Sequence, residues 1–315
     1  MPGSEHTQAH RQSARLAART LVACHFPVSA GQEVLIIFDA QKTLFALHLK
    51  EALEAADASV HLVDVTGEPA KVSELLQQLA DCRATGLLVL ASHSMWVTGL
   101  LPWADFDGGI PRLRIMCTPA WFDCLLPEES LIRKYSAPPD ELASYTEMTL
   151  SNLPRHRTVR VTSPAGTDLT LVTREWGVSS FSEVYTSPLE GSAQGTIVAD
   201  LSTHLGRVSC PITLVIDQGR LAALHCPEPD DQAYQAYQAE MEQRLAANPI
   251  DVCLAELGIG LNPCARLTGV IMEDETVRGT AHFCFGDNSR FGGANRSGFH
   301  GGTVVIDSPA LTVVE

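Results

Sequence analysis

The sequence predicts an α/β protein of two domains: a doubly wound parallel-sheet domain over residues 1–150, followed by a strand-rich α+β domain over residues 151–315. Three observations support this class. The first half alternates near-continuous apolar segments with amphipathic ones, the pattern of a parallel sheet covered by helices on both faces. The second half shows short alternating segments bounded by turn residues, which is typical of antiparallel strands. The length of 315 residues suits about two domains.

The first domain is expected to begin with a helix and then to alternate strands with helices. We expect helices at 13–24, 43–56 and 70–82, and strands at 33–40, 59–65, 85–92 and 113–117. Residues 84–104 carry no charge and could span a bilayer, but polar residues and a proline interrupt them, so we interpret them as core.

Asp39 follows the first predicted strand, where a ligand or a cap could lie. We favour a turn or helix cap. No G-x-G-x-x-G follows it and no Walker lysine motif is present, so a nucleotide function is not supported.

The second domain is predicted to be mainly strands after one helix at the boundary. That helix covers 137–154, the strands cover 158–163, 169–173, 195–200 and 212–224, and one further helix covers 229–247. On this last helix Tyr234, Tyr237, Met241 and Leu245 recur at spacings of three or four, which indicates core or a subunit interface.

Charge and cysteine usage limit the partners. The net charge of −15 should repel nucleic acid and anionic membranes and suits a neutral or cationic ligand, such as a peptide with a free amine. The nine cysteines form no C-x-x-C pair, and the count is odd. This pattern favours a reducing, cytoplasmic setting over a disulfide framework or a zinc site. Cys284, between two phenylalanines, is interpreted as a small hydrophobe.

Candidate ligands for a metal ion lie in the second domain. Glu183 and Glu256 stand among apolar residues, where a carboxylate is costly unless it is paired, protonated or metal-bound. His282 lies in a predicted strand and His300 follows a glycine-rich loop. Two carboxylates and two histidines suit a divalent site. Two unrelated hydrogen bonds remain the alternative, because a single histidine is more often structural. The run 273–275 is expected to form the solvated tip of a hairpin.

The segments SEVYTSP, AELGIGLNP and GTAHFCFGDN, followed by FGG and a histidine, resemble the thermophilic metalloaminopeptidase family typified by aminopeptidase T. They are also similar to the related iron-dependent 2,5-dihydroxypyridine dioxygenases. The N-terminal run ARLAARTLVACHFPVSAGQEVLIIFD looks like the opening helix and strand of the same family. The resemblance covers nearly the whole chain, and it implies a homodimer.

The resemblance implies two metal ions held by two glutamates, two histidines and the aspartate of an H-x-D pair. The four ligands that are retained would be Glu183, Glu256, His282 and His300. The aspartate position is Gly302 and the catalytic tyrosine position falls at Ser289. Glycine cannot coordinate a metal, and the loss of the tyrosine removes a proton donor.

Two hypotheses follow. In the first, the protein is a non-catalytic pseudoenzyme that binds a peptide, needs no cofactor and could present the peptide to modifying enzymes, as in a ribosomal-peptide natural-product pathway. In the alternative, it is an active aminopeptidase or ring-cleaving dioxygenase with a rearranged zinc, cobalt or iron site. Without metal, close approach of Glu183 and Glu256 should raise the pKa of one of them.

Overall fold

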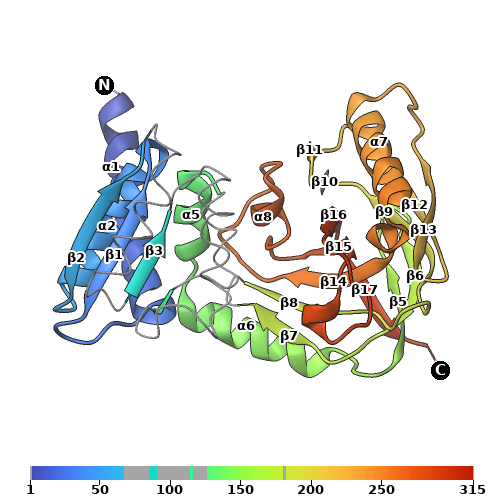
Figure 1. The fold of residues 1–315 in the computed structure, drawn as a ribbon, viewed down its shortest axis with the longest axis horizontal. Helices are drawn as coiled ribbons and strands as arrows, with labels where there is room; N and C mark the ends of the chain where they lie inside the picture. The colour runs from blue at the N-terminus through green and yellow to red at the C-terminus, as the bar shows by residue number, and fades with distance from the viewer. Residues whose placement is uncertain (1, 67–85, 91–113, 116–125, 180–181, 315) are drawn as a thin grey trace. The chain divides into compact units, whose positions relative to one another are not determined.

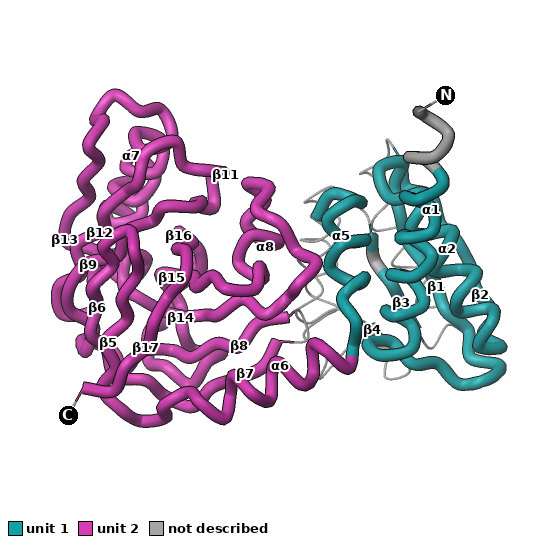
Figure 2. The backbone as a smooth tube through the Cα atoms, turned by 180° about the vertical axis from the view of Figure 1, so that it is seen from behind, with its two compact units in different colours: residues 1–139 teal, residues 140–315 magenta. Residues whose placement is uncertain are grey.

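The computed structural model describes residues 2–66, 86–90, 114–115, 126–179 and 182–314 (Figure 1). The chain divides into two compact units, Met1–Pro139 and Asp140–Glu315 (Figure 2). The division falls at the start of α6 (Pro139–Asn152), ahead of the predicted boundary near residue 150. Along the described ranges, no helix has the length and apolar character needed to cross a membrane.

The first unit contains a parallel sheet with the strand order β2-β1-β3-β4. Its elements are α1 (Pro2–Thr20), the π-helical turn Leu21–His25, β1 (Glu33–Phe38), the 3-10 turn Ala40–Lys42, α2 (Thr43–Glu54), β2 (Ser59–Asp64), β3 (Gly86–Val89), β4 (Arg114–Ile115) and α5 (Glu128–Tyr135). The parallel pairing and the positions of these strands agree with the sequence analysis. The helix predicted at 70–82 and most of the uncharged stretch 84–104 lie outside the described residues. Asp39 is a cap, as predicted, because its carboxylate accepts a hydrogen bond from the Gln41 amide at 3.0 Å.

The second unit contains two antiparallel sheets. The seven-stranded sheet runs β11 (Gly206–Arg207), β10 (Ser202–Thr203), β16 (His300–Asp307), β15 (Thr280–Gly286), β14 (Leu254–Gly260), β8 (Glu183–Thr186), β7 (Gly177–Ser179). The six-stranded sheet runs β13 (Arg220–His225), β12 (Ile212–Asp217), β9 (Gln194–Ala199), β6 (Asp168–Val172), β5 (Thr158–Thr162), β17 (Ala310–Val313). The helical elements besides α6 are α7 (Gln232–Ala247), α8 (Ile271–Asp274) and the 3-10 turns Pro249–Val252 and Ser289–Phe291.

One apolar core joins the two sheets and α7. Alternate residues of the strands, such as Leu169, Leu214 and Phe283, point into it and are fully buried. The stripe on α7 contributes Tyr234, Tyr237 and Met241, none more than 7% exposed. The stripe is therefore core, and the suggestion that it forms a dimer surface is wrong for these three residues.

The carboxylate run 273–275 is not a solvated hairpin tip, so that prediction is wrong for its first two members. Glu273 and Asp274 lie in α8 and are 1% and 0% exposed. Asp274 accepts hydrogen bonds from the backbone amides of Thr268 and Gly269, and Glu273 accepts one from the amide of Arg266. These bonds replace the water that a buried carboxylate loses.

Candidate functional site

The predicted site residues come from four neighbouring strands of the seven-stranded sheet. Glu183 begins β8, Glu256 lies in β14, His282 lies in β15 and His300 begins β16, and these strands are adjacent in the order β16-β15-β14-β8. The residues that alternate with them, Leu257 and Phe283 among others, point into the core. The four side chains therefore gather on the face of this sheet that is turned away from the core.

A bulge in β14 aims Glu256. Leu254 is opposite Phe285, but Glu256 rather than its predecessor is opposite Cys284. The extra residue keeps Leu254 on the core face and turns the carboxylate of Glu256 to the face that carries His282. The glutamate is only 6% exposed there.

A second bulge aims His300. Phe283 pairs with Val304, whereas Phe285 pairs with Gly301, so Gly302 is the extra residue of β16. Its φ of +61° lies in the left-handed region that favours glycine. The shift puts His300 opposite Gly286, on the face that carries His282.

A side chain at Gly302 would point away from the site. An added Cβ would lie 3.0 Å from Met241 Sδ and 3.5 Å from Phe285 Cδ2, and both residues belong to the core. The carbonyl oxygen of Gly302 accepts a hydrogen bond from the Tyr237 hydroxyl at 2.8 Å. On this backbone, Gly302 therefore shapes the strand, and an aspartate in its place could not reach the site.

The four candidate ligands are in close contact. His300 Nε2 lies 2.9 Å from Glu256 Oε2. His282 Nε2 lies 3.8 Å from Glu256 Oε1 and 3.7 Å from Glu183 Oε2. Gly258 makes room for the imidazole of His282, because a Cβ at this position would come within 2.2 Å of Nε2.

Both imidazoles are held by their other nitrogen. His282 Nδ1 is 3.2 Å from the Glu275 carbonyl oxygen, and His300 Nδ1 is 2.7 Å from the Asp287 carbonyl oxygen. A carbonyl only accepts, so each Nδ1 carries a proton and each Nε2 faces the carboxylates. An Nε2 lone pair in this position needs either a proton or a metal ion, and proteins hold metal-binding histidines in the same way.

The electrostatics of the site follow from these contacts. Burial acts to raise the pKa of Glu256, but the contacts with His282 and His300 outweigh it and hold the pKa below its usual value. Burial acts to lower the pKa of each histidine, but the pairing with Glu256 outweighs it and raises both. The upward shift expected from repulsion between the glutamates is therefore not found at Glu256, because the histidines lie against its carboxylate.

Two residues of this face were missed by the sequence analysis. Cys284 is two residues from His282 on β15, is 4% exposed, and its sulfur lies 3.1 Å from Thr303 Oγ1. Tyr185 is two residues from Glu183 on β8, and its pKa is raised by burial and then by the charges of Glu256 and Glu183. The period of two along each strand was the signal that could have found both.

Ser289, the residue at the expected tyrosine position, is held in a turn. Its amide and its hydroxyl both donate to Asp287 Oδ1, at 2.8 and 2.6 Å. The neighbouring Phe291 instead lies beside the site, with its ring centroid 5.2 Å from that of His300 and 5.1 Å from that of Tyr185.

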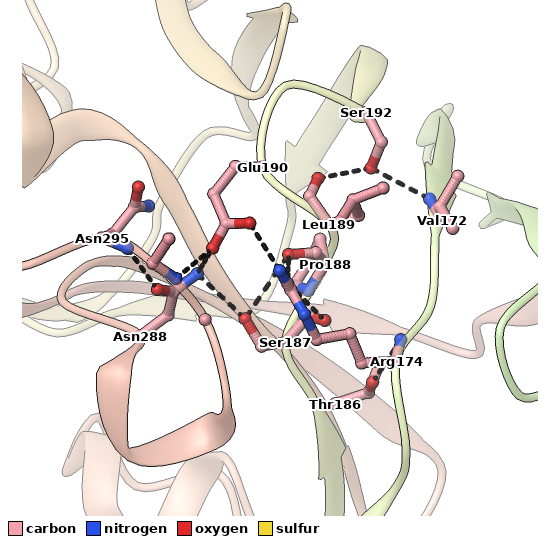
Figure 3. A network of polar contacts seen from close by, with 12 residues as sticks. Val172, Arg174, Thr186, Ser187, Pro188, Leu189, Glu190, Ser192, Asn288 and Asn295 are labelled. Carbon is pink, nitrogen blue, oxygen red and sulfur yellow. Dashed lines mark hydrogen bonds and ion pairs between the residues drawn. The ribbon is translucent and has the colours of Figure 1, made fainter.

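A polar network holds the loop 287–299, which connects β15 to β16 (Figure 3). Glu190 accepts hydrogen bonds from the Asn288 side chain at 2.9 Å and from the Ala294 amide at 2.6 Å, and it pairs with Arg174. Asn288 is fully buried and also donates to Ser187. Burial acts to raise the pKa of Glu190, but these donors outweigh it and lower the pKa to about 2. The network therefore fixes the loop that carries Phe291 and leads into His300.

Solved structures share this fold. The 2,5-dihydroxypyridine dioxygenase from Pseudomonas putida KT2440 superposes with a TM-score of 0.63 at 17% identity, over 96% of this chain and 94% of that chain. Wild-type AmpT, an aminopeptidase T from Thermus thermophilus, superposes with a TM-score of 0.62 at 12% identity, over 95% of this chain and 94% of that chain. No protein-family profile and no curated protein matches the sequence. The predicted resemblance is thus confirmed, and at these identities it is the fold that is shown.

Proposed function

We propose that this protein binds one divalent transition-metal ion through Glu183, Glu256, His282 and His300, and that it does not carry out two-metal peptide hydrolysis. The proposal rests on the two histidines, whose Nε2 atoms are turned toward carboxylates by carbonyl groups on the other side of each ring. Carboxylate and imidazole donors suit zinc, cobalt and iron(II).

We expect no second metal ion at this site. It would need another anionic ligand to bridge the two cations. The family resemblance assigns that ligand to Gly302, where a side chain would meet Met241 and Phe285 in the core. Hydrolysis would further need the tyrosine that Ser289 replaces.

A bound divalent ion would supply Lewis acidity toward a carbonyl or carboxylate oxygen of the ligand. Tyr185 lies on the same face of the sheet, and burial together with the charges of Glu256 and Glu183 raises its pKa. The ring of Phe291 lies beside that of His300, with 5.2 Å between the two centroids.

The test is metal content per chain, measured by mass spectrometry after purification without chelator and dialysis against zinc. We expect one equivalent for the wild type and a large loss of metal for Glu256→Gln. Glu242→Gln, on the exposed side of α7, is the matched control and should retain the metal. No metal in the wild type, or two equivalents, would contradict the proposal.

We propose further that the ligand is a peptide, bound without cleavage and presented to other enzymes. The net charge of −15 supports a ligand with a free amine. The absence of a donor at Gly302 and the turn that holds Ser289 support the lack of hydrolysis. Binding of a labelled peptide panel by fluorescence anisotropy tests the first part. Shortening of any peptide by one residue, detected by mass spectrometry, would contradict the second.

A further inference from the structure

We propose that the thiolate of Cys284 is a ligand of this metal ion, together with Glu256 and His282. The inference rests on the proposed metal binding and adds a sulfur donor that neither the sequence resemblance nor the donor set of two glutamates and two histidines contains.

Cys284 lies where it can share an ion with Glu256 and His282. His282 and Cys284 are two apart on β15, and the bulge in β14 brings Glu256 opposite Cys284. One ligand atom from each of the three residues lies within 4.8 Å of the others, and all three residues are buried. A single ion at the centre of such a triangle reaches each atom with small side-chain movements, since zinc bonds are about 2.0–2.3 Å long.

The side chains around the Cys284 sulfur are polar. A cysteine that acts only as a small hydrophobe packs among apolar side chains. Cys284 instead faces Glu256, His282 and the hydroxyl of Thr303, while the apolar Phe283 and Phe285 beside it in the chain point into the core.

Gly302 stands at the position where the family resemblance implies an aspartate ligand. A side chain at Gly302 would point toward Met241 and Phe285, so this position presents no carboxylate to the face that carries Glu256. The thiolate supplies one negative charge from the adjacent strand. On binding, the sulfur–metal bond forms and the thiol proton passes to solvent.

This donor set predicts metal preference. Thiolate ligands favour zinc, cobalt(II) and iron(II) over magnesium, calcium and manganese, which prefer oxygen. His300 and Glu183, the other two donors of the proposed site, contact Glu256 and His282.

The experiment is an anaerobic cobalt(II) titration of the full chain, followed by absorption. We expect visible d–d bands together with a near-ultraviolet thiolate-to-cobalt charge-transfer band. Cys284→Ser should lose the charge-transfer band and keep the d–d bands, with weaker binding. Cys264→Ser, a partly exposed thiol outside the triangle, is the matched control and should keep both.

The outcomes separate the two proposals. Visible bands without the charge-transfer band in the wild type would overturn the role of Cys284 and leave the metal site standing. The absence of both would overturn the proposed function itself.

X-ray absorption of the zinc-loaded wild type tests the same inference without a variant, so its result does not depend on whether Cys284→Ser folds. A sulfur scatterer at about 2.3 Å is expected. A shell of nitrogen and oxygen alone would overturn the inference.

Discussion

The substitution Gly302→Asp separates two explanations of the missing carboxylate. If Gly302 were only a lost ligand, restoring aspartate would recover metal affinity. The structure predicts the opposite, because the added Cβ would lie 3.0 Å from Met241 Sδ and 3.1 Å from its Cε, inside the core. The carboxylate would then be buried without a partner.

The expected loss of stability in Gly302→Asp has two contributions. A non-glycine residue at φ +61° costs about 1–2 kcal/mol, less for asparagine and aspartate. An uncompensated buried charge costs about 3–5 kcal/mol. Gly302→Ala reports the backbone strain together with the close contact of the Cβ with Met241, Gly302→Asn adds a polar side chain, and Gly302→Asp adds the charge. Against a typical total stability of about 5–15 kcal/mol, the aspartate variant is severely destabilised.

Urea unfolding of the three Gly302 variants at pH 7 and pH 4 measures these losses of stability. Burial raises the pKa of the introduced carboxyl above its unfolded value, so the loss of stability should be largest at pH 7 and should shrink as the group protonates toward pH 4. The asparagine variant should lack this extra pH dependence. A Gly302→Asp protein that is as stable as Gly302→Asn at pH 7 and binds a second equivalent of zinc would refute the reasoning.

Three further substitutions test the supports of the site by urea unfolding. Glu190→Gln removes a carboxylate whose folded pKa is about 2. Its contribution to the free energy of unfolding, about 1–2 kcal/mol after allowance for solvent, is present above the unfolded pKa of ~4.3 and is lost as pH falls toward 2. The stabilities of wild type and variant should therefore converge in acid. Tyr237→Phe leaves the Gly302 carbonyl without its buried donor, and we expect a loss of about 1–3 kcal/mol; no change would mean that the bond to the bulge is unimportant. Asp274→Asn weakens three acceptor contacts below α8 and should lower stability by a similar amount, whereas the exposed Glu242→Gln should not.

Much of the fold was predictable because local periodicity carries it. The apolar run of β1 and the alternating β5 were placed within a few residues, and the stripe on α7 was assigned to core or interface. Glu183, Glu256, His282 and His300 were selected from their settings and from the resemblance, and the structure brings them together.

The errors arose where a local rule was applied without the three-dimensional surroundings. A run of three carboxylates usually faces solvent, but Glu273 and Asp274 are buried because backbone amides of residues 266–269 donate to them. The interpretation of Cys284 as a small hydrophobe rested on its phenylalanine neighbours; Cys284 is buried, but those neighbours point to the opposite face of β15.

The sequence by itself determined the mixed α/β class, several of the strands and helices, and the inventory of candidate donors, because these depend on periodicity and residue type. Only the tertiary structure decided where the donors point. Each bulge adds one residue to a strand, and a shift of one residue moves a side chain to the other face of a sheet. The bulges before Glu256 and at Gly302 therefore bring the Glu256 carboxylate and the His300 imidazole to the face that carries Cys284, and a side chain at position 302 would point into the core.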